Sequence, residues 1–522
     1  MTQNKLILGV AIFYTIFYNW MFFSNVTKTF PVAGENIGFL ISLGLLLIAF
    51  IVLLLSIVSS KWTTKPILIL VTLISSLTAY FMDTFHVVID ELMIANVIQT
   101  DMNESMDLLT LKQVGYFIIL GVLPSFIIYK IKINYQSFIQ ELISKLKAIL
   151  LSLASIAVIV LMFSQHYTSF FREHSVLRYY TNPTYWIYSI GFYINRTFNT
   201  GQIVMKHIGL DAKVVSHDKK RKLTILVVGE AARADRFGLN GYKKDTNPLL
   251  KKENIVNLSN LYSCGTSTAE SVPCMFSIYD RSDYSYKKGI STHNVLDVLK
   301  TAGVQVLWRD NNSDSKGVAL RVEYQNYKSP KNNTMCKGEC RDEGMLVGLD
   351  SYINTYPKKD ILIVLHQMGN HGPAYYKRYP KEFEKFTPVC KNNQLQKCKQ
   401  EEISNSYDNA ILYTDYFLSR VINFLKSYST SYQTSMIYMS DHGESLGENG
   451  LYLHGLPYFM APDTQTHIAG LLWFGDDRFN TIDGDKSYSH DNLFHTLLGL
   501  YSVKTKVYNY KLDILNNSVK GK

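Results

Sequence analysis

Five long apolar stretches in the first third of the chain constrain its fold more than any other feature of the sequence. Each is close to the roughly 20 residues that cross a bilayer as a helix. One such stretch could be a buried core helix, but five in succession predict a transmembrane domain with five helices. The stretches are residues 6–23, 37–58, 66–82, 114–129 and 147–164.

The lysines between these stretches predict how the domain is oriented. Alternation of the spans places the N-terminus and the loops 59–65 and 130–146 on one side of the membrane, and these segments hold six lysines. The loops 24–35 and 84–113, on the other side, hold two. Because cytoplasmic loops are enriched in lysine and arginine, we expect a cytoplasmic N-terminus and an exported C-terminal part.

The rest of the chain differs in character from this apolar third. Residues 166–217 are rich in arginine and in tyrosine and other aromatic residues, a composition that suits helices at the membrane–water interface. From residue 218 onward the sequence is that of a globular domain long enough for a large core. We therefore predict a transmembrane domain at 1–165, interfacial bridging helices at 166–217 and an exported globular domain at 218–522.

The formal net charge of +10 narrows the choice of partners. A basic chain can bind nucleic acid, anionic lipid or phosphorylated molecules. The sequence has neither a basic stripe with interleaved aromatic residues nor zinc-finger spacing, so we expect no nucleic-acid partner. Together with the apolar stretches, the charge favours anionic lipid or a phosphorylated substrate.

All six cysteines fall in the C-terminal half, as three close pairs. In an exported domain this pattern favours disulfides between near neighbours, although six cysteines allow other connectivities. A structural zinc site is the weaker alternative because no C-x-x-C pair occurs. The expected bridges are Cys264–Cys274, Cys336–Cys340 and Cys390–Cys398.

Three apolar runs rich in β-branched residues predict strands of a mainly parallel sheet in the globular domain. They occupy residues 222–229, 360–365 and 435–439, with helical patterns such as 404–427 between them. This alternation is typical of an α/β fold in which helices flank a central sheet. Ligands bind at the carboxyl ends of the strands in such sheets, so the residues that follow each run are candidate site residues.

Carboxylates and a histidine follow two of these runs. Glu230 comes directly after the first run, and Asp441 and His442 follow the third. Their oxygen and nitrogen donors suit zinc. The segment 264–274 is rich in small and hydroxyl residues, so Thr268 could place a nucleophilic oxygen at a helix N-terminus, where phosphate is favoured. The set predicts metal-assisted phosphoryl chemistry.

Each of these residues also has a plainer interpretation. Thr268 could cap a helix, Glu230 could be a surface residue, and the triplet 441–443 could be a turn. His366 lies inside a strand-like run, so packing or hydrogen bonding fits it better than catalysis. The joint occurrence of the candidates at corresponding strand ends favours a common site.

Several longer segments carry a resemblance to a known family. They are residues 228–235, 264–277, 308–313, 370–376, 440–448 and 454–457. In these segments the chain resembles the lipid A phosphoethanolamine transferases of Gram-negative inner membranes, whose soluble domain has the alkaline phosphatase/sulfatase fold. The resemblance covers nearly the whole chain, including the spans and the bridging segment.

The resemblance implies a zinc site and a nucleophile. By position, Glu230, Thr268, Asp441 and His442 look like zinc ligands, with one ion held tightly and a second joining during turnover. Thr268 also looks like the nucleophile, because a metal-bound hydroxyl is favoured in its deprotonated form. Glu270 departs from the family pattern, in which we expect an uncharged or variable residue.

Other residues are implied to contact the substrates. Lys316, His371 and His454 resemble residues that hold the phosphate or ethanolamine group or assist proton transfer. Asn96 and Thr100, in the second exported loop, resemble residues that approach the site from the membrane side.

The implied function is transfer of phosphoethanolamine from phosphatidylethanolamine to lipid A or another envelope acceptor. It proceeds through a covalent phosphoethanolamine–threonine intermediate and releases diacylglycerol. We expect a monomer in the bacterial inner membrane with a periplasmic catalytic domain. The alternative is a membrane-anchored glycerol-phosphate transferase or phosphodiesterase of the same fold. A sulfatase is disfavoured because segment 271–275 lacks the arginine of the C/S-x-P-x-R motif.

Overall fold

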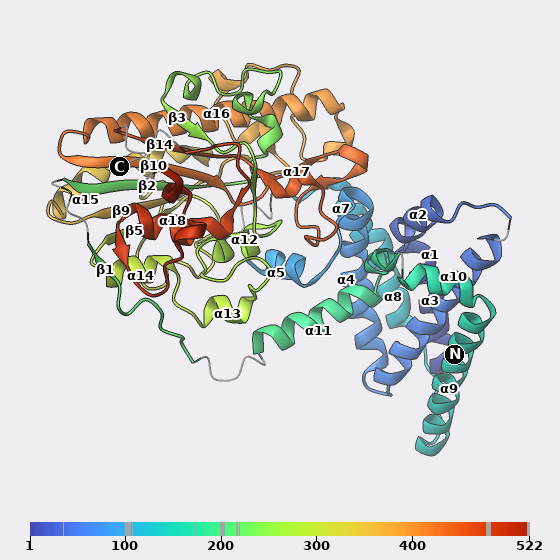
Figure 1. Cartoon of the computed structure of the whole chain (residues 1–522). Coiled ribbons are helices and arrows are strands. Elements are labelled where there is room, and N and C mark those ends of the chain that lie inside the picture. The colour runs from blue at the N-terminus through green and yellow to red at the C-terminus, as the bar shows by residue number, and fades with distance from the viewer. Residues whose placement is uncertain are drawn as a thin grey trace. The chain divides into compact units, whose positions relative to one another are not determined.

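The structure is a computed structural model of the chain and forms two compact units (Figure 1). The first unit comprises Met1–Ile94 and Leu109–Ile194, and the second comprises Ala95–Leu108 and Asn195–Lys522. The residues that the structure describes are 1–34, 36–99, 106, 108–172, 174–198, 204–215, 218, 220–476 and 482–518.

Among the described residues, four helices of the first unit are long and apolar enough to cross a membrane. A fifth span exists only if α1 (Gln3–Phe17) and α2 (Trp20–Thr29), which are bent by 59°, are counted as one. The described part of the first unit therefore contains four or five candidate membrane spans, as expected of a transmembrane domain. The four long helices are α3 (Asn36–Val58), α4 (Thr64–Phe85), the run Leu111–Lys130 and α9 (Phe138–Met162).

The first apolar stretch, residues 6–23, is not one continuous helix as the sequence suggested. The break falls at residues 18–19, between α1 and α2. Asn19 is fully buried there, and its Nδ2 donates to Tyr14 O at 3.0 Å and to Asn182 O at 2.6 Å. An asparagine side chain that bonds backbone carbonyls competes with the helical hydrogen bonds, which explains the bend.

The run Leu111–Lys130 contains a wider helical turn in its middle. It consists of α7 (Leu111–Tyr116), a π-helical segment (Phe117–Val122) and α8 (Leu123–Lys130). Pro124 lies in the first turn of α8 and has no backbone N–H to donate to the preceding turn. A π-helical segment accommodates such a missing donor without ending the helix.

Short helices lie in the predicted bridging region and in the loop 84–113. The bridging region holds α10 (Ser164–Arg172), a 3₁₀ helix (Ser175–Tyr180) and α11 (Thr184–Phe198). The second loop between spans holds α5 (Glu91–Gln99). The division between the two units after Ile194 falls inside α11, so the bridging region is shared between them.

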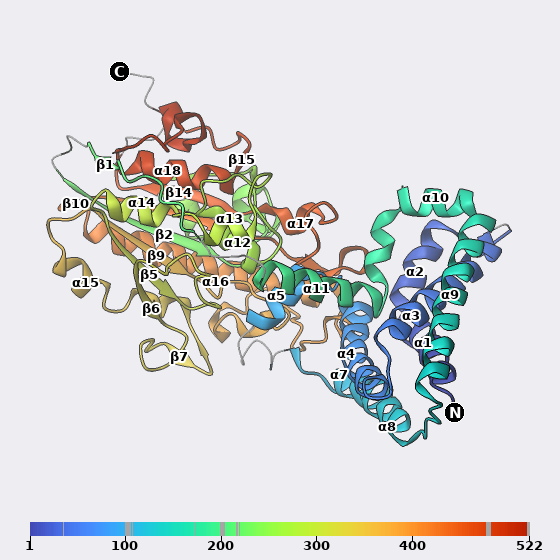
Figure 2. The same ribbon diagram turned by 90° about the horizontal axis from the view of Figure 1, so that it is seen from below.

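The second unit is built on a seven-stranded sheet with the order β3-β14-β10-β2-β9-β5-β6. Its strands are β2 (Arg221–Gly229), β3 (Ile255–Asn257), β5 (Gln305–Asp310), β6 (Glu323–Asn326), β9 (Ile361–His366), β10 (Tyr432–Ser440) and β14 (Gly470–Phe474). Figure 2 shows β10, β2, β9, β5 and β6 in this order, each parallel to its neighbour. Because β14 runs antiparallel to both β10 and β3, the sheet is mixed rather than parallel throughout.

Helices cover both faces of this sheet (Figure 1). One face packs against α15 (Leu349–Thr355) and α16 (Gln400–Ser427), and the other against α12 (Thr268–Met275), α14 (Val295–Thr301) and α18 (Leu493–Leu500). Alternate residues of β2 enter the two cores: Leu226 and Val228 pack with α14 and α18, whereas Ile225 and Val227 pack with α16. Burial on both faces explains why the strands read as continuous apolar runs.

Smaller elements and three disulfides complete the second unit. The remaining elements include β1 (Lys213–Val214), β4 (Leu261–Tyr262), β7 (Cys336–Lys337), β8 (Glu339–Cys340), β11 (Ser445–Leu446), β12 (Tyr452–Leu453), β13 (His467–Ile468), β15 (Tyr488–Ser489), β16 (Val503–Lys504), α13 (Tyr286–Ile290) and α17 (Asp463–Thr466). The disulfides are Cys264–Cys274, Cys336–Cys340 and Cys390–Cys398, the pairs expected from the sequence.

Candidate metal and nucleophile site

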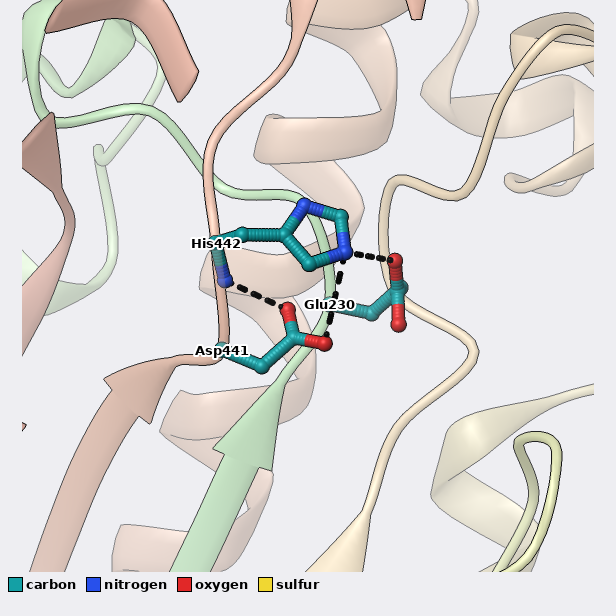
Figure 3. A group of neighbouring side chains, drawn as sticks. All are labelled: Glu230, Asp441 and His442. Carbon is teal, nitrogen blue, oxygen red and sulfur yellow. Dashed lines mark hydrogen bonds and ion pairs between the residues drawn. The ribbon is translucent and has the colours of Figure 1, made fainter. Parts of the chain in front are cut away.

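Two neighbouring parallel strands bring a pair of carboxylates and an imidazole to one point. β2 and β10 pair in register, with Gly229 opposite Ser440. Glu230 follows the first strand, and Asp441 and His442 follow the second. All three side chains are buried with 0% exposure. His442 Nε2 lies 3.3 Å from Glu230 Oε1 and 3.4 Å from Asp441 Oδ2 (Figure 3).

Backbone groups orient the two residues that follow β10. His442 Nδ1 donates to Gly443 O at 2.7 Å, which leaves the lone pair of the ring on Nε2. Asp441 Oδ1 accepts from His442 N at 2.7 Å and from Ala231 N at 3.2 Å, so Oδ2 is turned toward the site. Ala231 has a left-handed backbone, with φ 53°, a strained conformation of the kind that clusters at functional sites.

These acceptors fit a metal cation. Burial lowers the pKa of His442 to about 4, so the ring is neutral at physiological pH. Among the described residues, no donor bonds the buried Oδ2 of Asp441. The three ligand atoms lie within 4.8 Å of one another, where acceptors repel unless a cation lies between them. Two carboxylates and one imidazole are donors that suit zinc.

Thr268 is the first residue of α12 and directs its hydroxyl at this group. Its Oγ1 donates to Glu230 Oε2 at 3.1 Å and lies 3.4 Å from His442 Nε2. Ser267 occupies the N-cap position, and Thr268 bonds a carboxylate, so helix capping does not explain Thr268. This places a hydroxyl at a helix N-terminus, beside carboxylates that could hold a metal ion.

The neighbouring strand ends hold Glu230 in position. Asn312, after β5, donates from Nδ2 to Glu230 Oε2 at 2.8 Å and to Gln367 O at 2.6 Å. Gly369, after β9, has φ 50°, and a Cβ there would lie 2.9 Å from Glu230 O. Only glycine accommodates both the left-handed backbone and this close approach. No individual role was predicted for Asn312 or Gly369, although both lie in or beside segments that carry the resemblance.

Asp342 is a further buried residue of the site region that the sequence did not reveal. It accepts from Asn311 Nδ2 at 2.8 Å, from Met368 N at 2.8 Å and from Gly369 N at 3.1 Å. These bonds fix the loop between β9 and His371. Asp342 begins a 3₁₀ helix (Asp342–Leu346) and no apolar strand-like run precedes it in the sequence, so no sequence signal indicated it.

Two further histidines lie beside His442. The ring centroids of His442 and His454 are 4.2 Å apart, and those of His454 and His371 are 5.9 Å apart. Glu444 Oε2 lies 3.1 Å from His454 Nδ1, and burial raises the pKa of Glu444. Burial lowers the pKa of His371 well below its ordinary value, so this ring is neutral. The structure thus brings together the three histidines that the sequence singled out.

The loop before α12 connects the nucleophile to the histidine loop. Thr266 Oγ1 donates to Leu456 O at 2.6 Å, and Gly455 N donates to Thr266 O at 2.9 Å. The disulfide Cys264–Cys274 closes the same loop onto α12. Thr268 and His454 therefore belong to two loops that are bonded to each other.

The remaining candidates have other surroundings. Lys316, on the loop after β5, has a left-handed backbone with φ 50°, and its Nζ donates to Ser313 O at 2.7 Å. Its side chain lines a cavity together with Pro273 of α12. Asn96 lies on α5, in the part of the chain that groups with the second unit. Thr100 lies outside the described residues.

His366 and Glu270, two further residues considered from the sequence, pack against neighbouring groups. His366 Nδ1 lies 2.8 Å from Asp310 Oδ2, and both side chains are fully buried, which confirms the expectation of a hydrogen-bonded core histidine. The Glu270 side chain packs against Gly265 of the nucleophile loop. Its Cγ lies 2.9 Å from the position that a Cβ on Gly265 would occupy.

Both parts of the chain match known proteins. Residues 222–503 match the family described as Sulfatase, and residues 47–198 match the family described as Phosphoethanolamine transferase EptA/EptB. Phosphatidylethanolamine transferase Mcr-1 of Escherichia coli is 44% identical over 95% of this chain and 94% of its own length. Phosphoethanolamine transferase EptA of Escherichia coli (strain K12) is 39% identical over 98% of this chain and 96% of its own length.

A solved structure agrees with both halves of the fold. The integral membrane protein lipooligosaccharide phosphoethanolamine transferase A from Neisseria meningitidis matches with a TM-score of 0.93 and 34% identity, covering 98% of each chain. The first unit is therefore a transmembrane domain and the second a sulfatase-like α/β domain, as in a membrane-anchored member of the alkaline phosphatase/sulfatase superfamily. Within that superfamily, the chain belongs to the lipid A phosphoethanolamine transferase family.

Proposed function

We propose that this chain transfers phosphoethanolamine from phosphatidylethanolamine to lipid A, with Thr268 as the covalent carrier. The observation that carries the proposal is the position of the Thr268 hydroxyl, 3.1 Å from Glu230 Oε2 and beside His442. The similarity to Mcr-1 and EptA supports the choice of phosphoethanolamine as the transferred group.

In the first step, Thr268 Oγ1 forms a bond to the phosphorus of phosphatidylethanolamine while the bond from phosphorus to the glycerol oxygen breaks. The threonine hydroxyl proton passes to Glu230 Oε2, which accepts its hydrogen bond. Diacylglycerol leaves and takes up a proton. His454 is the candidate donor, because its Nδ1 lies 3.1 Å from Glu444 Oε2 and its ring lies beside that of His442.

In the second step, a phosphate oxygen of lipid A attacks the phosphorus of the adduct, and the bond from phosphorus to Thr268 Oγ1 breaks. The released threonine oxygen takes its proton back from Glu230, and His454 regains a proton from water, which restores the starting state. We assign Lys316 to the charge on the phosphoryl oxygens, since stabilising that charge is the main task in phosphoryl transfer. His371, whose ring centroid lies 5.9 Å from that of His454, is the candidate for accepting a proton when the acceptor is a hydroxyl.

Glu230, Thr268, Asp441 and His442 are the residues that would hold one zinc ion tightly, and the histidines near His442 could help to hold a second during turnover. Bound zinc supplies positive charge that favours the alkoxide of Thr268 and offsets charge at the transferred group.

The membrane domain gives the reaction its location. We propose a monomer in the bacterial inner membrane, with a cytoplasmic N-terminus, spans within 1–165, bridging helices at 166–217 and a periplasmic catalytic domain at 218–522. The distribution of lysines between the spans supports this orientation. Donor and acceptor are both amphiphiles, so tethering the site at the membrane raises its effective concentration over them. Asn96 and Thr100 would then approach the substrates from the membrane side.

The test follows a fluorescent phosphatidylethanolamine in membranes that contain the full-length protein and lipid A. We expect wild type to release fluorescent diacylglycerol and to modify lipid A, and Thr268→Ala to lose at least about 10³-fold in rate. Thr301→Ala, on the outer helix α14, is the matched control and should keep full activity. Full activity of Thr268→Ala would contradict the proposal.

The same assay separates the alternatives. Release of diacylglycerol without modified lipid A would indicate a phosphodiesterase, and turnover of phosphatidylglycerol instead of phosphatidylethanolamine would indicate a glycerol-phosphate transferase.

A further inference from the structure

A buried histidine outside the metal group connects the nucleophile loop to the strand that carries Asp441. His490 directly follows β15, and β15 pairs in parallel with β4, with Ser489 opposite Tyr262. This pairing places His490 beside the loop that leads from β4 to Thr268. The His490 side chain is 1% exposed, so its polar atoms must find partners inside the protein.

Both ring nitrogens of His490 bond groups that belong to the site. Nδ1 accepts from Cys264 N at 3.0 Å, so the ring proton lies on Nε2, which donates to Ser440 O at 2.9 Å. Cys264 begins the disulfide-closed loop that contains Thr268. Ser440 is the last residue of β10, directly before Asp441. The imidazole is therefore a bridge between the nucleophile loop and the strand end that carries two metal-binding residues.

Ser271 adds a second connection between the same two elements. It lies one helical turn after Thr268 on α12, and its hydroxyl donates to Asp441 O. The Ser271 Oγ also lies 3.3 Å from His490 Nδ1. Two successive carbonyls at the end of β10 thus accept hydrogen bonds, Ser440 O from His490 and Asp441 O from Ser271 of α12. All these groups are buried, where an unmade hydrogen bond is costly.

We infer that His490 is a positioning residue for the transfer reaction, which sets the Thr268 hydroxyl against the metal-binding carboxylates without touching either. The inference rests on the proposed function of Thr268 and goes beyond it by naming what fixes the position of Thr268. Its expected effect follows from geometry, because a displacement of about 1 Å in an active site can cost about 10²-fold in rate.

Three substitutions of His490 test its two hydrogen bonds together and separately. His490→Ala removes both bonds. His490→Gln retains a donor that can reach Ser440 O, and His490→Asn retains an acceptor for Cys264 N. We expect His490→Ala to lower kcat by about 10- to 100-fold, with the KM for phosphatidylethanolamine and the bound zinc changed by less than about twofold. We expect Gln and Asn to restore part of kcat.

His495→Gln is the matched control. His495 is a buried histidine of α18 whose Nδ1 accepts from Asn509 N at 3.1 Å, outside the metal group. Its replacement should lower the melting temperature but leave kcat of the folded protein near that of wild type. An unchanged kcat in His490→Ala would overturn the inference, as would a loss of activity that follows the loss of zinc.

A structure of His490→Ala tests the inference independently of activity. Movement of Thr268 Oγ1 away from Glu230 Oε2 supports a positioning role, and retention of the 3.1 Å contact overturns it. If wild type itself transfers nothing, the proposed function fails, and this structural comparison still decides the role of His490. If wild type is active and the His490 variants equal it, only the positioning role fails.

Discussion

Asn312 Nδ2 donates a hydrogen bond of 2.8 Å to Glu230 Oε2, the same oxygen that accepts from Thr268 Oγ1. The amide also donates to Gln367 O at 2.6 Å, so it joins the ends of β5, β2 and β9. With Oε2 engaged in this way, Oε1 of Glu230 is the oxygen that faces His442 Nε2, at 3.3 Å. Partners of this kind orient the ligands of a metal and raise their affinity for it.

Replacing Asn312 should therefore weaken metal binding. We expect Asn312→Ala to lower zinc affinity by about 10- to 100-fold, and Asn312→Asp to lower it further because a second carboxylate would face Glu230. Competition with a chromophoric chelator measures this affinity. Asn332→Ala, which removes a surface bond to Asn326 O, serves as the control. Equal zinc affinity in Asn312→Ala and wild type would show that the amide does not orient Glu230.

Gly369→Ala should displace Glu230 as well, through a close contact with its backbone. The new Cβ would lie 2.9 Å from Glu230 O at a backbone φ of 50°, so either the loop or Glu230 must move. We expect a loss of about 1–3 kcal/mol in unfolding free energy, together with weaker zinc binding.

The matched control for this variant is Gly303→Ala. Gly303 has φ 96° but no atom within 4 Å of its added Cβ, so it carries the backbone strain without the contact. Urea unfolding and chelator competition on both variants separate the two effects. Equal zinc affinities in the two variants would contradict a specific clash with Glu230.

The burial of Asp415, which lies outside the metal site, predicts that the unfolding free energy depends on pH. Asp415 is fully buried on α16, accepts from Leu249 N and Leu250 N at 3.0 Å each, and burial raises its pKa to about 7. The folded state therefore binds the proton more tightly than the unfolded state, and stability falls as pH rises from about 4 to about 7.

Asp415→Asn should remove this contribution. Unfolding free energies of the full-length protein, measured across that pH range, should decline less steeply in the variant, with a difference of at most ~4 kcal/mol. Identical slopes for the two proteins would show that the carboxyl of Asp415 does not titrate differently on folding.

The sequence was sufficient for the metal-binding group because its members follow strands that can be recognised. Glu230 and the pair Asp441 and His442 come directly after apolar β-branched runs, and parallel strands deliver such residues to one edge of a sheet. Thr268 was harder, because its local sequence also suits a helix cap. In the structure its hydroxyl bonds Glu230 Oε2, which favours a site residue over a helix cap.

Residues that hold other residues in place could not be recognised from the sequence. Asp342 bonds Gly369 N, and Asn19 bonds Asn182 O across the first unit, and neither pairing follows a local period. The break of the first span at Asn19 depends on that distant carbonyl, so an apolar window could not predict it. The antiparallel direction of β14 likewise depends on chain topology rather than on its own residues.

If Thr268 carries the transferred group, a covalent phosphoethanolamine adduct on its side chain can be detected. Full-length protein is incubated with phosphatidylethanolamine in the absence of an acceptor, digested and examined by tandem mass spectrometry, with Thr268→Ala in parallel. We expect a phosphoethanolamine group on Thr268 of the wild type, no adduct in Thr268→Ala, and loss of the group when lipid A is added. An adduct on a different residue, or transfer to lipid A without any adduct on Thr268, would contradict this role of Thr268.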